Sequence, residues 1–594
     1  MAQQTVSDFL VQRLNDWNVD RIFGYSGDGI NGVMGALDDS PTPIEFIQVR
    51  HEESAAFMAC ATAKFSKQVG VCMTTGGPGA IHLLNGLYDA KLDHQPCVAI
   101  VGQKARHGMG SNSQQEINLA GLFADVSEYV ETINVAEQAP VVIDRAVRIA
   151  QDRRTVTTII LPSDVQNLDM PDRVQPKRDA ARSAPGYSAP RIIPAKTDLE
   201  RAAEVLNSGK KVAILVGAGC LGAAEPLKAL AHKLQAGVAK AMLGKAVLPD
   251  DLPYVTGCLG LLGTEPSDQM MRHCDTLLMI GTTFPYTQFL PEDGQARGVQ
   301  IDISGKSQSV FYPAEVNLTG DAHNTIEALL PYLEQKEPSR WREDIEDNIG
   351  KWWDKLEARA HQEADPINPQ RLFWELSPKL PDRSILCADS GTAANWFARD
   401  IKIRESMDAS LSGKLASMCP AIPYAIAAKF AHPDRVAFAF IGDGAMQMLG
   451  ITHLITIAKY WQNWQDPRLI VLVLNNHDLA QVTWEMRAME GNRKFTDSQN
   501  IPDMDYAQFA RDLGLAGKRI DNPDTIASCW DEALTADRPF VIDAVCDADV
   551  PTTPPHITLE QAKNYLTSIF KGDAERLGFV RQTLRDLVTP NKHQ

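Results

Sequence analysis

The sequence predicts an α/β protein built from three doubly wound parallel-sheet domains. Short apolar runs such as KVAILVGAG, DTLLMIGT, RVAFAFIGDG and RLIVLVLNN end in Gly, Thr or Asn, which is the pattern of buried parallel strands. Helical patterns lie between these runs, as the crossover connections of a parallel sheet require. Two polar, proline-containing stretches, 171–194 and 334–347, interrupt this rhythm. They predict the domain boundaries.

These boundaries divide the chain into three domains and a tail. We expect an N-terminal domain over residues 1–185, a central domain over 190–335, a C-terminal domain over 345–556 and a helical tail over 557–594. A chain of 594 residues is long enough for this organisation. The first and third domains share a similar length and strand-helix rhythm, which suggests two related folds.

Composition narrows the function to small-molecule chemistry. The ten cysteines are scattered without a CxxC pair, which argues against a disulfide framework and a zinc site. No apolar run approaches the roughly 20 residues of a membrane span, and a formal charge of −17 disfavours a nucleic-acid binder. The N-terminal MAQQTVSDFLVQRLNDW has the pattern of an amphipathic helix without a signal-peptide core. We therefore expect a cytoplasmic protein.

The most informative motif is IGDG, which is followed by NN at the end of the next predicted strand. Gly442 and Gly444 let a phosphate approach the backbone at the carboxyl edge of a parallel sheet. Asp443 would repel a diphosphate at a helix N-terminus unless a cation lies between them. We expect Mg²⁺, held by Asp443, Asn476 and Asp478 together with diphosphate oxygens. Either turn alone is more often a tight turn or a helix cap; the pair favours the metal site.

GDG followed by NN resembles the thiamine diphosphate fingerprint. Over about residues 3–560 the chain resembles the pyruvate oxidase and quinone-linked pyruvate dehydrogenase branch, which is related to the acetohydroxyacid synthases. Further markers in family order are YSGDGINGV, VRHEESAAFMA, TTGGPGAIHLLNGLYDAKLDHQP, SQQEI, GTTFPYTQFLP, QIDIS, LTGDA and ADSGT. The resemblance implies a pyrimidine-binding first domain, a central FAD-type domain and a diphosphate-binding third domain.

The resemblance also assigns roles at the thiamine cofactor. The carboxyl group of Glu52 would hydrogen-bond the aminopyrimidine ring, and Gln115 would be a second catalytic residue. Met418, which without the resemblance is an ordinary core methionine, would support the bend of the cofactor. The carbonyl of Ala416 would accept from the aminopyrimidine; Gly is usual there, and we expect Ala to be tolerated. The other residues expected to bind thiamine diphosphate are Gly391, Thr392, Gly442, Asp443, Gly444 and Asn476.

The catalytic glutamate and the metal motif lie in different domains, so one site needs both. In the family that the chain resembles, the two domains come from different subunits. The resemblance therefore implies a homodimer or a homotetramer.

The central domain carries GxGxxG in KVAILVGAGCLGAA, directly after a predicted strand. An NAD site would need an acidic residue about 20 positions further on, and AGVAKAMLGKAV has none. The resemblance instead implies FAD, although relatives exist whose central domain has lost the flavin. The residues expected to bind FAD are Gly217, Gly219, Thr282, Thr283, Asp302 and Asp321.

The predicted substrate residues are Gln114, Gln481 and Glu485. Gln114 and Gln481 stand where the oxidases that the chain resembles have Phe. Two amides in place of aromatic rings suit a larger or more polar 2-oxo acid, or altered electron transfer.

The expected activity is oxidative decarboxylation of a 2-oxo acid, pyruvate first, with electrons passing through FAD to quinone or oxygen. The alternatives are an acetolactate synthase-like carboligase, a non-oxidative 2-oxo acid decarboxylase and a catalytically silent nucleotide-binding homologue.

Two segments have purely structural expectations. In the tail, apolar residues from Leu577 to Val588 recur at helical spacing beside arginines. We expect this helix to pack on its own domain, with weak peripheral contact with a membrane as the alternative. The stretch YWQNWQDPR lengthens the spacing between GDG and NN, and we expect it to lie at the periphery.

Overall fold

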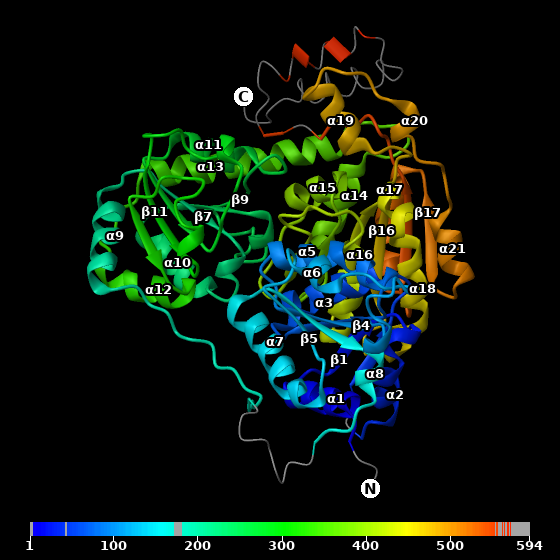
Figure 1. The fold of residues 1–594 in the computed structure, drawn as a ribbon. Coiled ribbons are helices and arrows are strands. Elements are labelled where there is room, and N and C mark those ends of the chain that lie inside the picture. Colours follow the sequence, from blue (N-terminus) through cyan, green and yellow to red (C-terminus); the bar gives the residue numbers. More distant parts are fainter. Residues whose placement is uncertain are drawn as a thin grey trace.

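The computed structural model describes residues 4–41, 44–171 and 181–552, together with residues 554, 555, 561, 563, 564, 567, 568 and 571. Three six-stranded parallel sheets flanked by helices confirm the predicted α/β architecture (Figure 1). In Figure 1 the first domain is blue to cyan, the central domain green, and the third domain yellow to orange. The predicted tail, including the stripe from Leu577 to Val588, lies outside the described residues apart from its few described positions.

The first and third sheets have the same strand order, which supports the expectation of two related folds. The orders are β2-β1-β3-β4-β6-β5 and β14-β13-β15-β16-β18-β17. The strands of the first sheet are β1 (Arg21–Gly24), β2 (Glu45–Gln48), β3 (Gly70–Thr74), β4 (Cys97–Gln103), β5 (Tyr129–Thr132) and β6 (Val156–Pro162). The strands of the third are β13 (Ile385–Ala388), β14 (Asp408–Ser410), β15 (Ala437–Gly442), β16 (Leu469–Asn475), β17 (Ala516–Ile520) and β18 (Phe540–Val545).

The central sheet has the strand order of dinucleotide-binding folds, β12-β11-β10-β7-β8-β9. The chain progresses in opposite directions from β7 and from β10, so the switch point lies between these two strands. The strands are β7 (Val212–Val216), β8 (Gly237–Lys240), β9 (Val255–Cys258), β10 (Thr276–Ile280), β11 (Arg297–Asp302) and β12 (Val316–Thr319).

Helices connect the strands within each domain. Those of the first domain are α1 (Val6–Asp16), α2 (Asn31–Asp39), α3 (Glu52–Ser66), α4 (Pro78–His82), α5 (Leu84–Leu92), α6 (Leu119–Phe123), α7 (Ala139–Arg153) and α8 (Ser163–Gln166). Those of the central domain are α9 (Lys196–Ser208), α10 (Ala224–Lys233), α11 (Glu265–His273) and α12 (Ala322–Leu329). The remaining helices are α13 (Arg340–Ala360), α14 (Pro369–Leu376), α15 (Thr392–Asp400), α16 (Ala421–Ala431), α17 (Asp443–Ala445), α18 (Ile451–Tyr460), α19 (Ala480–Ala488), α20 (Thr496–Gln499), α21 (Tyr506–Asp512) and α22 (Ile526–Leu534).

The first and third domains share one hydrophobic core. α3 packs against α16, and the alanines of both helices allow their backbones to approach closely. One cluster of buried apolar residues includes side chains of both helices and of both sheets. The two domains that carry the predicted cofactor motifs are therefore packed together within one chain.

The charged stretch 334–347, predicted as a domain boundary, is partly helical, because α13 begins at Arg340 and buries Ile345 and Trp352. One expectation about the chain's organisation is wrong. The aromatic residues of YWQNWQDPR are not peripheral: Tyr460 and Trp464 are 9% and 6% exposed and pack edge-on against one phenylalanine ring of α16. In both stretches the polar residues were obvious from the sequence, while the buried face needed the tertiary structure. The predicted N-terminal amphipathic helix is confirmed as α1. No described helix is both long enough and apolar enough to cross a membrane.

Candidate functional site

The third sheet has an open crevice at its topological switch point. The strand order reverses between β13 and β15, and Gly391 and Gly442 lie at the carboxyl ends of these strands. A Cβ atom added to either glycine would meet no heavy atom of the described residues within 4 Å. Thr392 begins α15, so the free N–H groups of a helix N-terminus lie at the same edge. Open space beside backbone N–H groups suits the diphosphate of a cofactor.

The equivalent crevice of the first sheet, between β1 and β3, is filled by the protein itself. Gly27 and Gly29 pack against Thr75: a Cβ on Gly27 would lie 2.6 Å from the Thr75 Cβ. The Gly29 N–H donates to Thr75 Oγ1 at 3.1 Å. Two sheets with one topology therefore differ at their ligand edge, and the third sheet keeps its crevice open.

The GDG and NN turns meet, as the sequence predicted. The carboxylate of Asp443 accepts from the N–H of His477 at 2.6 Å and from the N–H of Gly444 at 2.8 Å. Asp443 is only 2% exposed, and burial raises the pKa of this carboxyl to about 7. A cation beside the carboxylate would offset its desolvation, so the group fits the predicted Mg²⁺ site.

The other two predicted metal ligands, Asn476 and Asp478, already have hydrogen-bond or ion-pair partners within the protein. Asn476 lies in the turn, and its side-chain oxygen accepts from the N–H of Asp478 at 3.1 Å. The Asp478 carboxylate is held by Thr483 and Lys494, at 2.9 and 3.1 Å. Asn475 is buried and donates to Asp543 at 2.9 Å, which anchors the turn to β18. Asp443 is thus the carboxylate that fits a cation best.

Met418, which is predicted to support the cofactor, lies beside the GDG turn. The Met418 Cε atom is 3.7 Å from the position that a Cβ on Gly444 would take. The segment is clamped on both sides of Met418, because Asp389 accepts from the N–H of Cys419 at 2.8 Å and Ser390 donates to the carbonyl of Ser417 at 2.7 Å. Met418 is only partly buried, unlike an ordinary core methionine.

Ala416 has a left-handed backbone conformation, with φ of 51°. The expected tolerance of Ala in place of Gly rested on the use of its carbonyl alone. The structure adds a cost of about 1–2 kcal/mol that a non-glycine residue has in this region. The hydrogen bonds of the neighbouring clamp hold the segment in this conformation.

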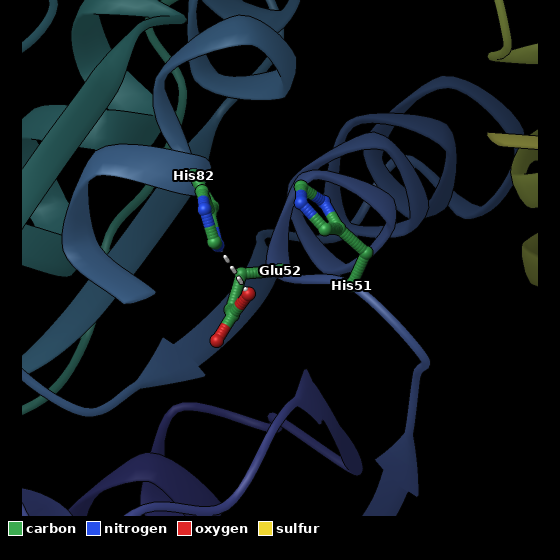
Figure 2. Close-up of side chains that lie close together, drawn as sticks. All are labelled: His51, Glu52 and His82. Atoms are coloured by element: carbon green, nitrogen blue, oxygen red, sulfur yellow. Dashed lines mark hydrogen bonds and ion pairs between the residues drawn. The ribbon is translucent and has the colours of Figure 1, made fainter. Parts of the chain in front are cut away.

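Glu52 lies at the N-terminus of α3, in contact with a histidine that the sequence reasoning missed. Its Oε2 atom is 2.9 Å from Nδ1 of His82, at the end of α4 (Figure 2). His51 is the N-cap of α3, where its Nδ1 accepts from the N–H of Glu53 at 3.3 Å. The rings of His51 and His82 stack with centroids 4.4 Å apart. Nothing in the local sequence pattern signals this contact, because His82 is 30 positions from Glu52.

These three side chains suit hydrogen bonding better than metal binding. Ligand atoms of His51, Glu52 and His82 lie within 4.8 Å of one another. However, Nδ1 of His51 is already engaged as the helix cap. The ring planes are only 29° apart, so the lone pairs of the two imidazoles run side by side and do not converge on one point.

The predicted Gln114 and Gln115 lie on an exposed loop next to α4. Gln115 has φ of 64° and packs on Gly77, where an added Cβ would lie 2.8 Å from the Gln115 Cβ. Glu116 shapes the loop by accepting from the N–H of Ser113 at 2.9 Å and from a second backbone N–H. Glu116 is the glutamate of the SQQEI marker and was not among the predicted site residues.

Gln481 is already hydrogen-bonded at both ends of its amide group. Its oxygen accepts from Asn395 of α15 at 2.9 Å, and its nitrogen donates to Glu485 at 3.0 Å. Asn395 was not among the predicted residues. The Gln481 amide, which the sequence suggested as a substrate contact, thus links α15 to Glu485.

The predicted FAD residues lie along the carboxyl edge of the central sheet, at the ends of β7, β10, β11 and β12, but several of them already have structural roles. A Cβ on Gly217 would lie 2.5 Å from the carbonyl oxygen of Gly281, so that glycine is needed for packing between two loops. Asp321 caps α12 by accepting from the N–H of Asn324 at 3.0 Å. Burial raises the pKa of Asp302. Gly219 and Thr282 pack at the same loop contact, with Thr283 next to them.

The carboxyl edge of the central sheet nevertheless presents apolar surface to solvent. Leu221, Tyr286 and Ile303 follow β7, β10 and β11, and all three are exposed. Exposed apolar side chains on loops that follow adjacent strands of such a sheet suit a flat, aromatic ligand.

The fold and this site define an α/β protein of three parallel sheets with an open ligand crevice at the switch point of the third. Family models of the thiamine pyrophosphate enzymes match residues 4–122 (N-terminal TPP binding domain), 199–329 (central domain) and 389–544 (C-terminal TPP binding domain). The chain belongs to the thiamine pyrophosphate enzymes, in the group that is related to pyruvate oxidases and acetolactate synthases.

Individual relatives align over nearly the whole chain. The Bacillus subtilis protein YdaP, named as thiamine pyrophosphate-containing, is 34% identical over 98% of this chain and 99% of its own length. Pyruvate oxidase of Lactiplantibacillus plantarum is 27% identical over 98% and 94%. The large subunit of acetolactate synthase isozyme 1 of Escherichia coli is 26% identical over 93% and 96%.

Proposed function

We propose that the protein catalyses the thiamine diphosphate- and Mg²⁺-dependent oxidative decarboxylation of a 2-oxo acid, pyruvate first, with electrons passed through FAD to quinone or oxygen. The observation that carries the oxidative part is the central sheet, whose dinucleotide-binding strand order and exposed apolar carboxyl edge suit a flavin. The name of the pyruvate oxidase relative supports the same choice.

In this proposal, residues of the first and third domains have separate roles at the thiamine cofactor. Bound thiamine diphosphate supplies the nucleophilic carbon and the electron sink for decarboxylation. Asp443 and Asn476 would hold the cation, and the turn before α15 would receive the diphosphate at Gly391. Met418 would support the cofactor from the side of the GDG turn, and Glu52 would hold a proton at its carboxyl group next to the aminopyrimidine.

We propose that the working enzyme is a homodimer or a homotetramer, with each site formed between two subunits. Ile81, next to His82, is 48% exposed, and Met448, just after the GDG turn, is 62% exposed. Large apolar side chains beside both halves of the site suit coverage by a second copy of the chain.

A mixture of two inactive variants tests this arrangement. Co-expression of Glu52→Gln and Asp443→Asn chains is expected to restore about a quarter of wild-type activity, because half of randomly formed dimers are mixed and each mixed dimer has one intact site. Each variant assembled alone is the control. A mixture as inactive as its components would place both residues of a site in one chain.

The visible spectrum of the purified protein tests the oxidative reaction. Flavin bands are expected, and they should bleach when pyruvate is added anaerobically with thiamine diphosphate and Mg²⁺. Omission of thiamine diphosphate is the control and should leave the bands unchanged. A protein without flavin would contradict the oxidative proposal and leave the thiamine chemistry standing.

A second candidate, an acetolactate synthase-like carboligase, is favoured by the polar link from Asn395 through Gln481 to Glu485. An amide in place of an aromatic wall leaves a more polar pocket for a second keto acid. Flavin bands that persist with pyruvate, together with a condensation product, would favour this candidate.

A further inference from the structure

The short helix α4 lies beside the Glu52 carboxylate and contacts it through His82. His82, at the C-terminal end of α4, faces Oε2 at 2.9 Å (Figure 2). Gly79, in the first turn of α4, leaves room for the other oxygen: a Cβ at this position would be 3.1 Å from Oε1 and 2.2 Å from Thr74 Oγ1. Glu52 itself is 8% exposed. The carboxylate is thus bounded by one helix that belongs to its own domain.

The ring of His82 is itself held in place. It stacks on His51, whose Nδ1 accepts from the N–H of Glu53 and so ties the ring to the first turn of α3. An Nδ1 that accepts leaves the proton of neutral His51 on Nε2. Burial lowers the pKa of His51, which keeps this ring neutral against its neighbour. His82 is therefore fixed between a neutral ring and a carboxylate.

A carboxylate oxygen accepts, so Nδ1 of His82 must donate. Oε1 of Glu52 receives no hydrogen bond from the described residues and is left to accept or share a proton elsewhere. We infer that His82 is a positioning residue for Glu52: its Nδ1–H fixes the plane of the carboxylate and directs Oε1 toward the cofactor ring. This inference rests on the proposed role of Glu52.

Three substitutions of His82 distinguish the contribution of its Nδ1–H donor from that of the packing of its ring. In His82→Asn, the amide nitrogen takes the place of Nδ1 and keeps the donor. In His82→Gln, the amide nitrogen lies farther out, near the place of Nε2, and in His82→Leu the donor is lost. Each variant is measured as the full chain with thiamine diphosphate and Mg²⁺, for kcat with pyruvate, for the dissociation constant of thiamine diphosphate, and for exchange of the cofactor C2 proton into D₂O.

The Leu and Gln variants are expected to lose about tenfold to a hundredfold in kcat and in C2-proton exchange, the range for losing one hydrogen bond to a charged group. Their dissociation constant for thiamine diphosphate should change by less than about threefold, because the diphosphate and the cation supply most of the binding. The Asn variant should stay within about threefold of the wild type in all three measurements.

Two results would overturn the inference. Wild-type exchange and kcat in the Gln or Leu variant would show that Glu52 needs no donor. Equal losses in all three variants, including Asn, would show that the ring matters as packing and its Nδ1–H does not. If the Leu variant does not fold, the contrast between Asn and Gln decides. Failure of the proposed function is distinct: the wild type would then bind no thiamine diphosphate, or Glu52→Gln would exchange the C2 proton normally.

Discussion

Glutamine in place of Glu52 is expected to lower kcat by at least about 100-fold, in the range for loss of a proton-transferring group. The amide keeps an oxygen that accepts from His82, so the contact with α4 and the start of α3 should survive. It has no ionisable proton to share with the aminopyrimidine. The measurement is kcat for the 2-oxo acid at saturating thiamine diphosphate and Mg²⁺, with circular dichroism to verify the fold.

The matched control is Glu128→Gln, which makes the same chemical change at an exposed site in the first domain. It should leave kcat unchanged. Undiminished turnover in Glu52→Gln would remove Glu52 from the proton-holding role and leave only its structural contacts.

Asparagine in place of Asp443 is expected to have opposite effects on stability and on cofactor binding. In the cation-free protein, burial raises the pKa of Asp443 to about 7, against about 4 in the unfolded chain. Between these two values the folded state holds a proton that the unfolded state has lost, so stability falls as the pH rises. Above pH 7 the ionised Asp443 lowers the free energy of unfolding by on the order of 4 kcal/mol. Asn at this position carries no charge and removes this loss.

At pH 8 the cation-free Asp443→Asn protein should therefore melt at a higher temperature than the wild type. At pH 4 the difference should largely vanish, because the wild-type carboxyl is then neutral in the folded state. Addition of Mg²⁺ and thiamine diphosphate should raise the Tm of the wild type and leave that of the variant nearly unchanged. Thermal unfolding at both pH values, with and without the ligands, measures all of these effects.

Asp400→Asn is the matched control for this prediction. Asp400 is also fully buried, and burial raises its pKa to about 7, but it lies at the far end of α15 from the crevice. Its variant should gain stability at pH 8 and keep the response to Mg²⁺ and thiamine diphosphate. A full ligand response in Asp443→Asn would contradict a cation site at Asp443.

Much of the candidate site was predictable from short stretches because its chemistry is local. A strand end, a glycine-flanked carboxylate and a helix N-terminus can each be recognised from a few consecutive residues. The meeting of the GDG and NN turns followed from one rule, that the carboxyl ends of parallel strands lie at a common edge. The hydrogen bond from His477 to Asp443 is the direct outcome of that rule.

Contacts across the chain were not predictable in this way. Gln481 looked like a free substrate contact, yet Asn395, 86 positions away, engages its amide oxygen. Tyr460 and Trp464 looked peripheral because polar residues surround them in the sequence, and the structure packs both against α16. In each case the partner lies on another helix or strand, and no periodicity in the sequence indicates the contact.

The sequence by itself determined the α/β class, the three sheets and the thiamine pyrophosphate enzyme family, because strand periodicity and turn chemistry are properties of neighbouring residues. Only the tertiary structure decided which of two identical topologies keeps an open crevice, since Thr75 fills one and no described residue fills the space over Gly391 in the other. It also decided that His82 meets Glu52. Side-chain contacts between separate elements depend on how helices and strands pack, and that information is spread over the whole chain.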